Sequence, residues 1–181
     1  MQKICLYPVL MIFFIVACFP NEINYSNRLF IQIEDTRFYL RCSHRDDVEA
    51  FFGQPDKVTF FERGSQDFFW RNFTVCEYED GMLRFHFREE GDVIRITVNK
   101  NYTKGVLIFG RLLCELDHAA VTFLLRQADI EISHASKTFI GSSTYDPEGN
   151  IIFISFWFDE ASELTWLDML YDEPWIEEIE S

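Results

Sequence analysis

Four side chains of the kinds that ligate zinc stand at two places in the sequence, Cys42 with His44 and Cys114 with His118. Cys114 and His118 are four residues apart, so on one helix they would share a face and could hold a metal ion together. Cys42 and His44 would have to complete the site from a distant part of the chain. A buried cysteine near an exposed histidine explains each pair more simply, because unbonded cysteines usually pack as small apolar side chains. We therefore expect no metal site and no cofactor.

Catalytic motifs are otherwise missing from the sequence. His44-Arg45-Asp46 matches the first letters of a kinase catalytic loop, but Phe51 stands where that loop needs a metal-binding asparagine. The patterns G-x-S-x-G, H-E-x-x-H and C-x-x-C do not occur. The adjacent carboxylates of Asp46-Asp47 and Glu89-Glu90 suit a helix start and a turn, and adjacency alone does not give the convergent geometry of a catalytic pair. The sequence therefore predicts no catalytic residues and a protein that is not an enzyme.

Alternating patterns in two segments predict strands with one apolar face and one face that could bind a partner. Residues 83–88 alternate Leu or Phe with Arg or His, and residues 93–98 follow the same period. In residues 151–158 one face would carry Ile152, Ile154, Phe156 and Phe158, and the other Ile151, Phe153, Ser155 and Trp157. Arginines beside exposed aromatic rings are enriched at protein–protein hot spots. The candidate partner-binding residues are Arg84, His86, Arg88, Arg95, Phe153 and Trp157. The alternative is that loops or the acidic residues 159–181, which hold no Lys or Arg, cover and neutralise this face.

The elements that must position these residues read as helices followed by antiparallel strands. Ser43 is a candidate N-cap, Val48, Phe51 and Phe52 form an apolar stripe at helical spacing, and Gly53 is a candidate helix end. A second helix, expected to be longer, is predicted from an apolar stripe between residues 113 and 125. Strands with one apolar face need cover on that face only, and the helices would supply it. The sequence therefore predicts an α+β fold whose antiparallel sheet is covered by helices on one face.

The folded part of the chain reads as the same unit twice. Residues 48–56 align without gaps on residues 121–129, and Tyr78-Glu-Asp-Gly81 precedes a strand as Tyr145-Asp-Pro-Glu-Gly149 does. The offsets agree within a few residues, which indicates an internal repeat of about 70 residues. Phe51 and Leu124 should then have matching core roles. We expect a signal peptide at 1–17, a tether at 18–27, two α+β units at 28–104 and 105–171, and an acidic tail at 172–181.

Composition limits the partners. The chain of 181 residues is 48% hydrophobic and 17% aromatic, so it can bury a sizeable core, and its formal net charge is −14. Removal of residues 1–17 would take away Lys3 and leave −15. A negative charge of this size repels phosphate backbones and anionic lipid heads, so we expect no nucleic-acid partner and no attachment through a basic patch.

The first residues predict export and a lipid anchor. Ile4 to Ala17 carries no charge and is too short to span a bilayer, which is typical of the apolar region of a signal peptide. Ile15-Val16-Ala17-Cys18 resembles the bacterial lipobox. That resemblance implies cleavage before Cys18, a diacylglycerol on its sulfur, and a cell-envelope lipoprotein attached to the cytoplasmic or outer membrane. Two or three acyl chains anchor a folded domain stably.

Two other features keep alternatives open. N-x-Ser/Thr sequons begin at Asn24, Asn72 and Asn101, as in a secreted glycoprotein with an ordinary signal peptide. If Cys18 is acylated, Cys42, Cys76 and Cys114 remain, an odd number that fits a disulfide framework poorly. A single Cys42–Cys114 disulfide is the alternative in an oxidising compartment.

A short helix ending in Phe51-Phe52-Gly53-Gln54-Pro55 and followed by an antiparallel meander, repeated on a lipoprotein, resembles the β-lactamase-inhibitor-protein-like fold. Small outer-membrane assembly lipoproteins of the SmpA/OmlA type share one copy of that unit. The resemblance covers about residues 39–170, and the second copy departs from it at Arg126 and Ala128. It implies binding through the helix-free sheet face, with another envelope protein as partner. A structural or envelope-assembly role through a different surface is the alternative.

Overall fold

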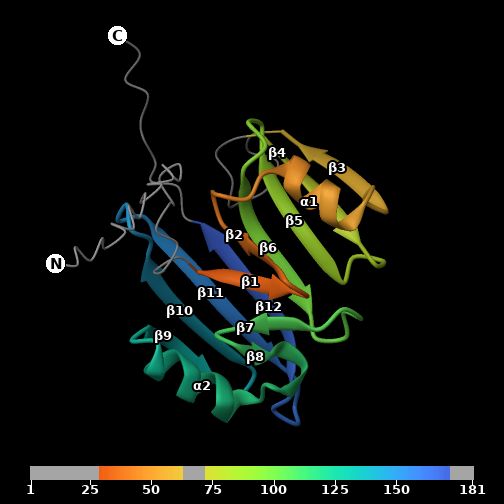
Figure 1. Cartoon of the computed structure of the whole chain (residues 1–181). Helices are drawn as coiled ribbons and strands as arrows, with labels where there is room; N and C mark the ends of the chain where they lie inside the picture. The colour runs from red at the N-terminus through yellow and green to blue at the C-terminus, as the bar shows by residue number, and fades with distance from the viewer. Residues whose placement is uncertain (1–28, 63–71, 172–181) are drawn as a thin grey trace, which may run out of the picture.

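The described residues, 29–62 and 72–171 of the computed structural model, form twelve β-strands and two short α-helices (Figure 1). Strands take up 52% of these residues and helices 16%. The first seven elements are β1 (Phe30–Ile33), β2 (Thr36–Tyr39), α1 (Arg45–Phe52), β3 (Lys57–Phe61), β4 (Phe73–Tyr78), β5 (Leu83–Arg88) and β6 (Val93–Asn99). The remainder are β7 (Val106–Ile108), β8 (Arg111–Leu112), a 3-10 turn (Leu113–Glu115), α2 (His118–Gln127), β9 (Glu131–Ser136), β10 (Phe139–Tyr145), β11 (Ile151–Phe158) and β12 (Leu164–Tyr171).

The strands form two antiparallel sheets. The large sheet has eight strands in the order β3-β4-β5-β6-β12-β11-β10-β9, and the small sheet has four in the order β2-β1-β7-β8. The large sheet is therefore two four-stranded meanders joined where β6 pairs with β12. We call β3 to β6 the first meander and β9 to β12 the second meander.

The order of elements occurs twice along the chain. Two short strands, a helix and a four-stranded meander lie within residues 30–99, and the same succession lies within residues 106–171. The two sets meet at equivalent strands, β1 against β7 in the small sheet and β6 against β12 in the large one. Each set therefore falls inside one of the two units expected from the sequence. The expected signal peptide, tether and acidic tail lie outside the described residues.

Local sequence explains where the helices begin and end. His44, rather than the expected Ser43, is the N-cap of α1: its Nδ1 accepts from the amide of Asp46, and the Asp47 carboxylate accepts from the amide of His44. Gly53 ends the helix with a φ of 81°, a value that a glycine adopts without strain. Asp117 caps α2, which runs ten residues against eight for α1. The second helix is longer than the first, as expected. It begins only at His118, however, and the start of the expected stripe, Leu113, lies in the preceding 3-10 turn.

One hydrophobic core lies between the large sheet and the layer that covers it. The small sheet and both helices lie on the same side of the large sheet, with α1 and α2 toward its opposite ends (Figure 1). Fully buried side chains from all of these elements form a single cluster, including Phe38 of the small sheet, Phe85 of the first meander and Phe156 of the second. Phe51 and Leu124, on α1 and α2, both pack against this cluster while remaining partly buried.

The expected α+β class is wrong, because the fold is mostly β. The helices do not cover the sheet by themselves: the four-stranded sheet covers its middle, and each helix adds only two to three turns at one end. The apolar faces of β5 and β11 are buried as the alternation predicted, as are Ile96 and Val98 of β6, but largely under strands that were not predicted from the sequence. A bulge reverses the first two residues of β6: Val93 packs in the main core and Ile94 in the smaller cluster on the other face.

Candidate binding surface

We call the side of the large sheet that faces away from the small sheet and the helices the outer face. Strand register places all six candidate residues on it, because side chains directly opposite each other in paired strands share a face. Arg84 and His86 on β5 lie opposite Thr97 and Arg95 on β6. On β11, Phe153 and Trp157 lie opposite Leu170 and Trp166 on β12. In the described part of the chain, no helix packs on this face.

Acidic neighbours neutralise two of the arginines. Arg95 donates two parallel hydrogen bonds to the carboxylate of Asp168, each 2.7 Å long, and the hydroxyl of Thr97 donates to the same carboxylate at 3.2 Å. Nε of Arg84 lies 3.4 Å from the carboxylate of Glu77. The expected basic stripe is therefore largely compensated, and by strand residues of the sheet itself. Asp168 lies within the acidic segment 159–181 that the sequence reading had named as a source of neutralisation.

Both arginines of β5 also lie near aromatic rings. The guanidinium of Arg84 is 5.8 Å from the ring centre of Trp166, and that of Arg88 is 5.9 Å from the ring centre of Tyr171. Such cation–π contacts hold a guanidinium against a ring while leaving its charge formally intact. The Arg84 side chain remains 42% exposed beside its ring.

His86 carries no charge at physiological pH. Burial, followed by the positive charges of Arg95 and Arg84, lowers the pKa of His86 to about 3. Its ring lies nearly parallel to that of Phe73, with the ring centres 5.8 Å apart. His86 thus belongs to the packed part of the outer face.

The neutral state of His86 predicts a specific pH dependence. The unfolded chain takes up a proton near pH 6.5 and the folded chain does not until about pH 3, so stability falls as the pH drops between these values. We expect about 1.4 kcal/mol of unfolding free energy to be lost between pH 7.5 and 5.5 through this residue. Urea unfolding at the two pH values measures it, with His86→Asn as the control that lacks the titrating ring. An equal loss in the variant would contradict the assignment.

The outer face of the second meander exposes a cluster of aromatic side chains, which we call the aromatic surface. Tyr145, Trp157 and Phe153 are 68%, 49% and 40% exposed. Phe139 of β10 lies opposite Trp157, with ring centres 4.5 Å apart. Gly141 leaves room for the ring of Phe139, because a Cβ at position 141 would lie only 2.9 Å from that ring. The aromatic surface consists of Phe139, Tyr145, Phe153, Trp157 and Trp166.

The outer face of the first meander is different. Phe73, Val75 and Ile94 are buried there in a second, smaller hydrophobic cluster, with Phe61 packed against it. The two meanders have the same strand order, but among the described residues the exposed rings on this face belong to the second meander. The sequence reading found Phe153 and Trp157 and missed Phe139 and Trp166, which lie on strands that it did not predict.

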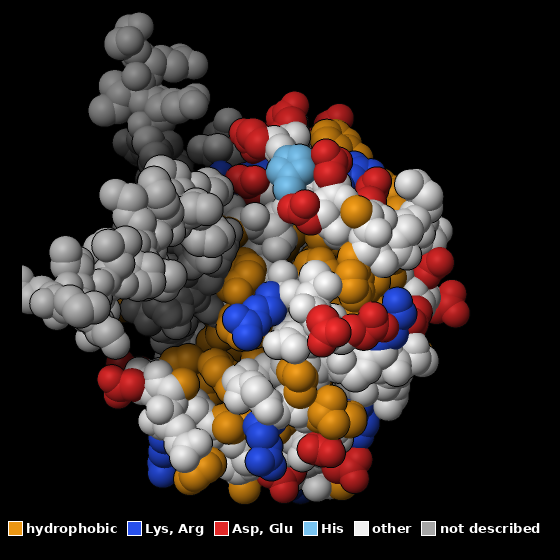
Figure 2. Space-filling view, in the orientation of Figure 1, with side chains coloured by type: hydrophobic (Ala, Val, Ile, Leu, Met, Phe, Trp, Pro, Cys, Tyr) orange, Lys and Arg blue, Asp and Glu red, His pale blue; other side chains and the backbone are white. Residues whose placement is uncertain are grey.

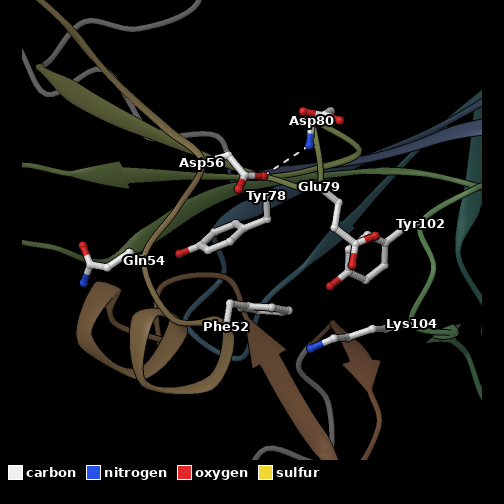
Figure 3. Close-up of a pocket in the computed structure, with 8 residues that line it drawn as sticks. All are labelled: Phe52, Gln54, Asp56, Tyr78, Glu79, Asp80, Tyr102 and Lys104. Atoms are coloured by element: carbon white, nitrogen blue, oxygen red, sulfur yellow. Dashed lines mark hydrogen bonds between the residues drawn. The ribbon is translucent and has the colours of Figure 1, made fainter.

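A pocket of about 320 Å³ lies on the other side of the sheet, at the end of α1 (Figure 3). Two of the carboxylates that line it accept hydrogen bonds from nearby residues. Glu79 accepts from the hydroxyl of Thr103 at 2.7 Å, and Asp56 accepts from the backbone amide of Asp80 at 3.2 Å. Its lining residues are Phe52, Gln54, Asp56, Tyr78, Glu79, Asp80, Tyr102 and Lys104.

The side chains around this pocket do not form a catalytic arrangement. Burial, reinforced by negative charge nearby, raises the pKa of Tyr78 and of Tyr102, so both hydroxyls stay protonated. The ammonium of Lys104 lies over the rings of Phe51 and Phe52, 5.5 and 5.6 Å from their centres. With both hydroxyls protonated, neither tyrosine is an activated nucleophile.

The candidate metal ligands do not converge. No three His, Cys, Asp or Glu side chains within residues 29–62 and 72–171 are arranged to hold a metal ion. The alternative Cys42–Cys114 disulfide is not formed, Cys76 is buried and Cys114 is an exposed thiol. His118 instead hydrogen-bonds the carbonyl of Ser136 at 2.9 Å.

Within the described ranges, no helix is long and apolar enough to cross a membrane. No protein-family model, curated protein or solved structure matches the chain.

Proposed function

We propose that this chain is a lipid-anchored cell-envelope protein that binds another protein, without catalysis, through the aromatic surface of the second meander. The exposure of Tyr145, Phe153 and Trp157 on one sheet face is the observation that carries the proposal. Clustered exposed rings on a rigid sheet lose little conformational freedom on binding and are typical of interface hot spots. The first meander buries the apolar side chains at its outer face. Exposed rings are therefore not a general property of this side of the sheet, and their exposure in the second meander favours a function.

Charge favours an apolar contact over a salt-dependent one. Arg95 and Arg84 are already paired with Asp168 and Glu77, and His86 is neutral. The partner is therefore expected to present apolar or aromatic groups to the centre of the surface. Ion pairs at its rim would affect the association rate more than the affinity.

Site-specific crosslinking in intact cell envelopes tests the binding proposal. A photoreactive amino acid at Phe153 is expected to give a discrete crosslinked species, because that side chain lies within the aromatic surface. The matched control is Phe123, which is 60% exposed on α2, on the opposite side of the sheet. Equal crosslinking from both positions, or none from Phe153, would contradict the proposal.

The anchor rests on Cys18, which follows the apolar run of the first residues. Cys18→Ser removes the thiol that would carry the diacylglycerol, so we expect the variant to lose acylation and leave the membrane fraction. Metabolic labelling with a radioactive fatty acid, followed by membrane fractionation, measures both effects. Cys114→Ser, which removes an exposed thiol elsewhere, should keep the label. Unchanged labelling and fractionation of Cys18→Ser would show that the anchor is not at this residue.

A further inference from the structure

The two edges of the large sheet are protected unequally. The edge strands β3 and β9 lie at its two ends (Figure 1). An unpaired strand edge presents backbone donors and acceptors to other chains, and folded proteins usually blunt it with charge, irregular register or a covering element. Edge β9 has all three forms of protection. Its exposed side chains are mostly polar, its register with β10 shifts between Gly141 and Ser142, and α2 packs against it.

Edge β3 is less protected: its register with β4 is unbroken, and within residues 29–62 and 72–171 no helix packs against it as α2 does against β9. Its sequence is Lys-Val-Thr-Phe-Phe, and all five residues pair with β4 in unbroken register. Val58 and Phe60 lie opposite Cys76 and Thr74, so both point to the side of the sheet on which α1 lies. They are nevertheless 50% and 58% exposed, and in the described part of the chain no residue of β3 belongs to the main core. The helix ends at Gly53, and Pro55 precedes the strand.

We propose that β3 is a strand-addition site that takes an extended peptide segment of another protein in which apolar residues alternate with Lys or Arg. The backbone of the peptide would continue the ladder beyond β3, and its apolar side chains would contact Val58 and Phe60. This surface is separate from the aromatic surface, at the far end of the sheet and on its other side.

The charge around β3 specifies the basic character of that segment. The exposed acidic residues Asp56 and Glu62 flank the strand, and Asp46 and Asp47 stand exposed at the start of α1. The lysine of the strand itself, Lys57, is paired with Glu77 at 2.9 Å. Figure 2 shows hydrophobic side chains at the surface beside α1 with acidic side chains around them. An acidic segment would be repelled here, and a basic one attracted.

A second copy of the chain fits the edge less well. Two five-residue strands pairing edge to edge would bury much less than the roughly 800 Å² per partner of a stable interface. Each copy also carries a formal net charge of −14, which opposes their association.

Fluorescence anisotropy with the full chain tests the proposal. The probe is a labelled synthetic peptide in which Val and Phe alternate with Lys. One control peptide carries Glu in place of Lys. The other has the composition of the probe, but its apolar residues are clustered instead of alternating. We expect binding of the alternating basic peptide only. Phe60→Lys should weaken it about tenfold or more. Phe123→Lys, which makes the same charge change at a residue of equal exposure, should leave it unchanged.

Hydrogen–deuterium exchange locates the peptide. Bound peptide is expected to slow exchange of amides in residues 57–61 and to leave residues 131–136 unaffected. Four results would overturn the proposal: no binding, equal loss in the two lysine variants, no protection of β3, or a dimer of the chain that Phe60→Lys dissociates. Both variants replace exposed side chains, and equal melting temperatures would confirm that each remains folded.

Discussion

Phe85→Ala is expected to lower the free energy of unfolding by about 3–5 kcal/mol. The Phe85 side chain is fully buried at the centre of β5, and its ring lies 5.4 Å from Phe38, 5.7 Å from Phe52 and 6.1 Å from Phe87, measured between ring centres. Truncation would remove these contacts and leave a cavity that the surrounding strands could fill only in part. Urea unfolding followed by tryptophan fluorescence measures the loss.

The same experiment tests whether the two halves fold as one unit. A single core cluster contains side chains from both meanders, so Phe156→Ala in the second half should shift the same transition by a similar amount. Phe123→Ala, at an exposed position on α2, is the control and should change stability by no more than about 0.5 kcal/mol. Two separate transitions, each sensitive to only one of the core variants, would contradict the shared core.

The parts of the fold that the sequence could predict are those with a strong local signal. Helix α1 carries its N-terminal acids, its apolar stripe and its terminal glycine within ten residues. Strands β5 and β11 alternate along their whole length, and β6 alternates from Arg95 onward, after a bulge at its start. The pattern therefore placed all six candidate binding residues on one face correctly.

The strands that were not predicted are short, polar or irregular. The two strands of the β7–β8 hairpin have three and two residues, and their turn places Phe109 at a φ of 51°, which no local pattern indicates. Strand β10 contains Gly141 and Ser142, residues that usually weaken a strand. Strand β12 lay inside the second predicted unit, but no strand was predicted there. Because those strands cover or extend the large sheet, their absence from the prediction led to the wrong fold class.

The sequence suggested that residues 159–181 could neutralise the outer face, but local pattern could not predict which charges pair. Arg95 and Asp168 are 73 residues apart and meet only because β6 pairs with β12. The alternation of Arg84, His86 and Arg88 implied an exposed basic stripe. Burial makes His86 neutral, and an acid on the neighbouring strand compensates Arg84. The aromatic part of the candidate surface could be predicted from the sequence, because its position depends only on side-chain type and strand register. This part is the basis of the proposed function.

Trp157→Ala is expected to weaken partner binding at least tenfold while lowering the melting temperature by no more than about 4 °C. About half of the Trp157 side chain is exposed, and its main contacts on the surface are with the rings opposite it on β10 and β12. Losing such cross-strand contacts costs up to about 1 kcal/mol, which corresponds to about 2–4 °C in a chain of this size. Truncation of an aromatic hot spot at an interface costs about 2 kcal/mol or more.

The most direct test of the proposed binding surface is therefore a paired measurement on Trp157→Ala, its melting temperature and its crosslinking yield from Phe153 in intact envelopes. A melting temperature close to that of the unaltered chain, together with loss of the crosslinked species, is the predicted result. A fall in melting temperature of about 10 °C or more, the size expected for a core residue, would show that Trp157 stabilises the fold. Undiminished crosslinking would show that the partner does not depend on this ring, and either result would contradict the account.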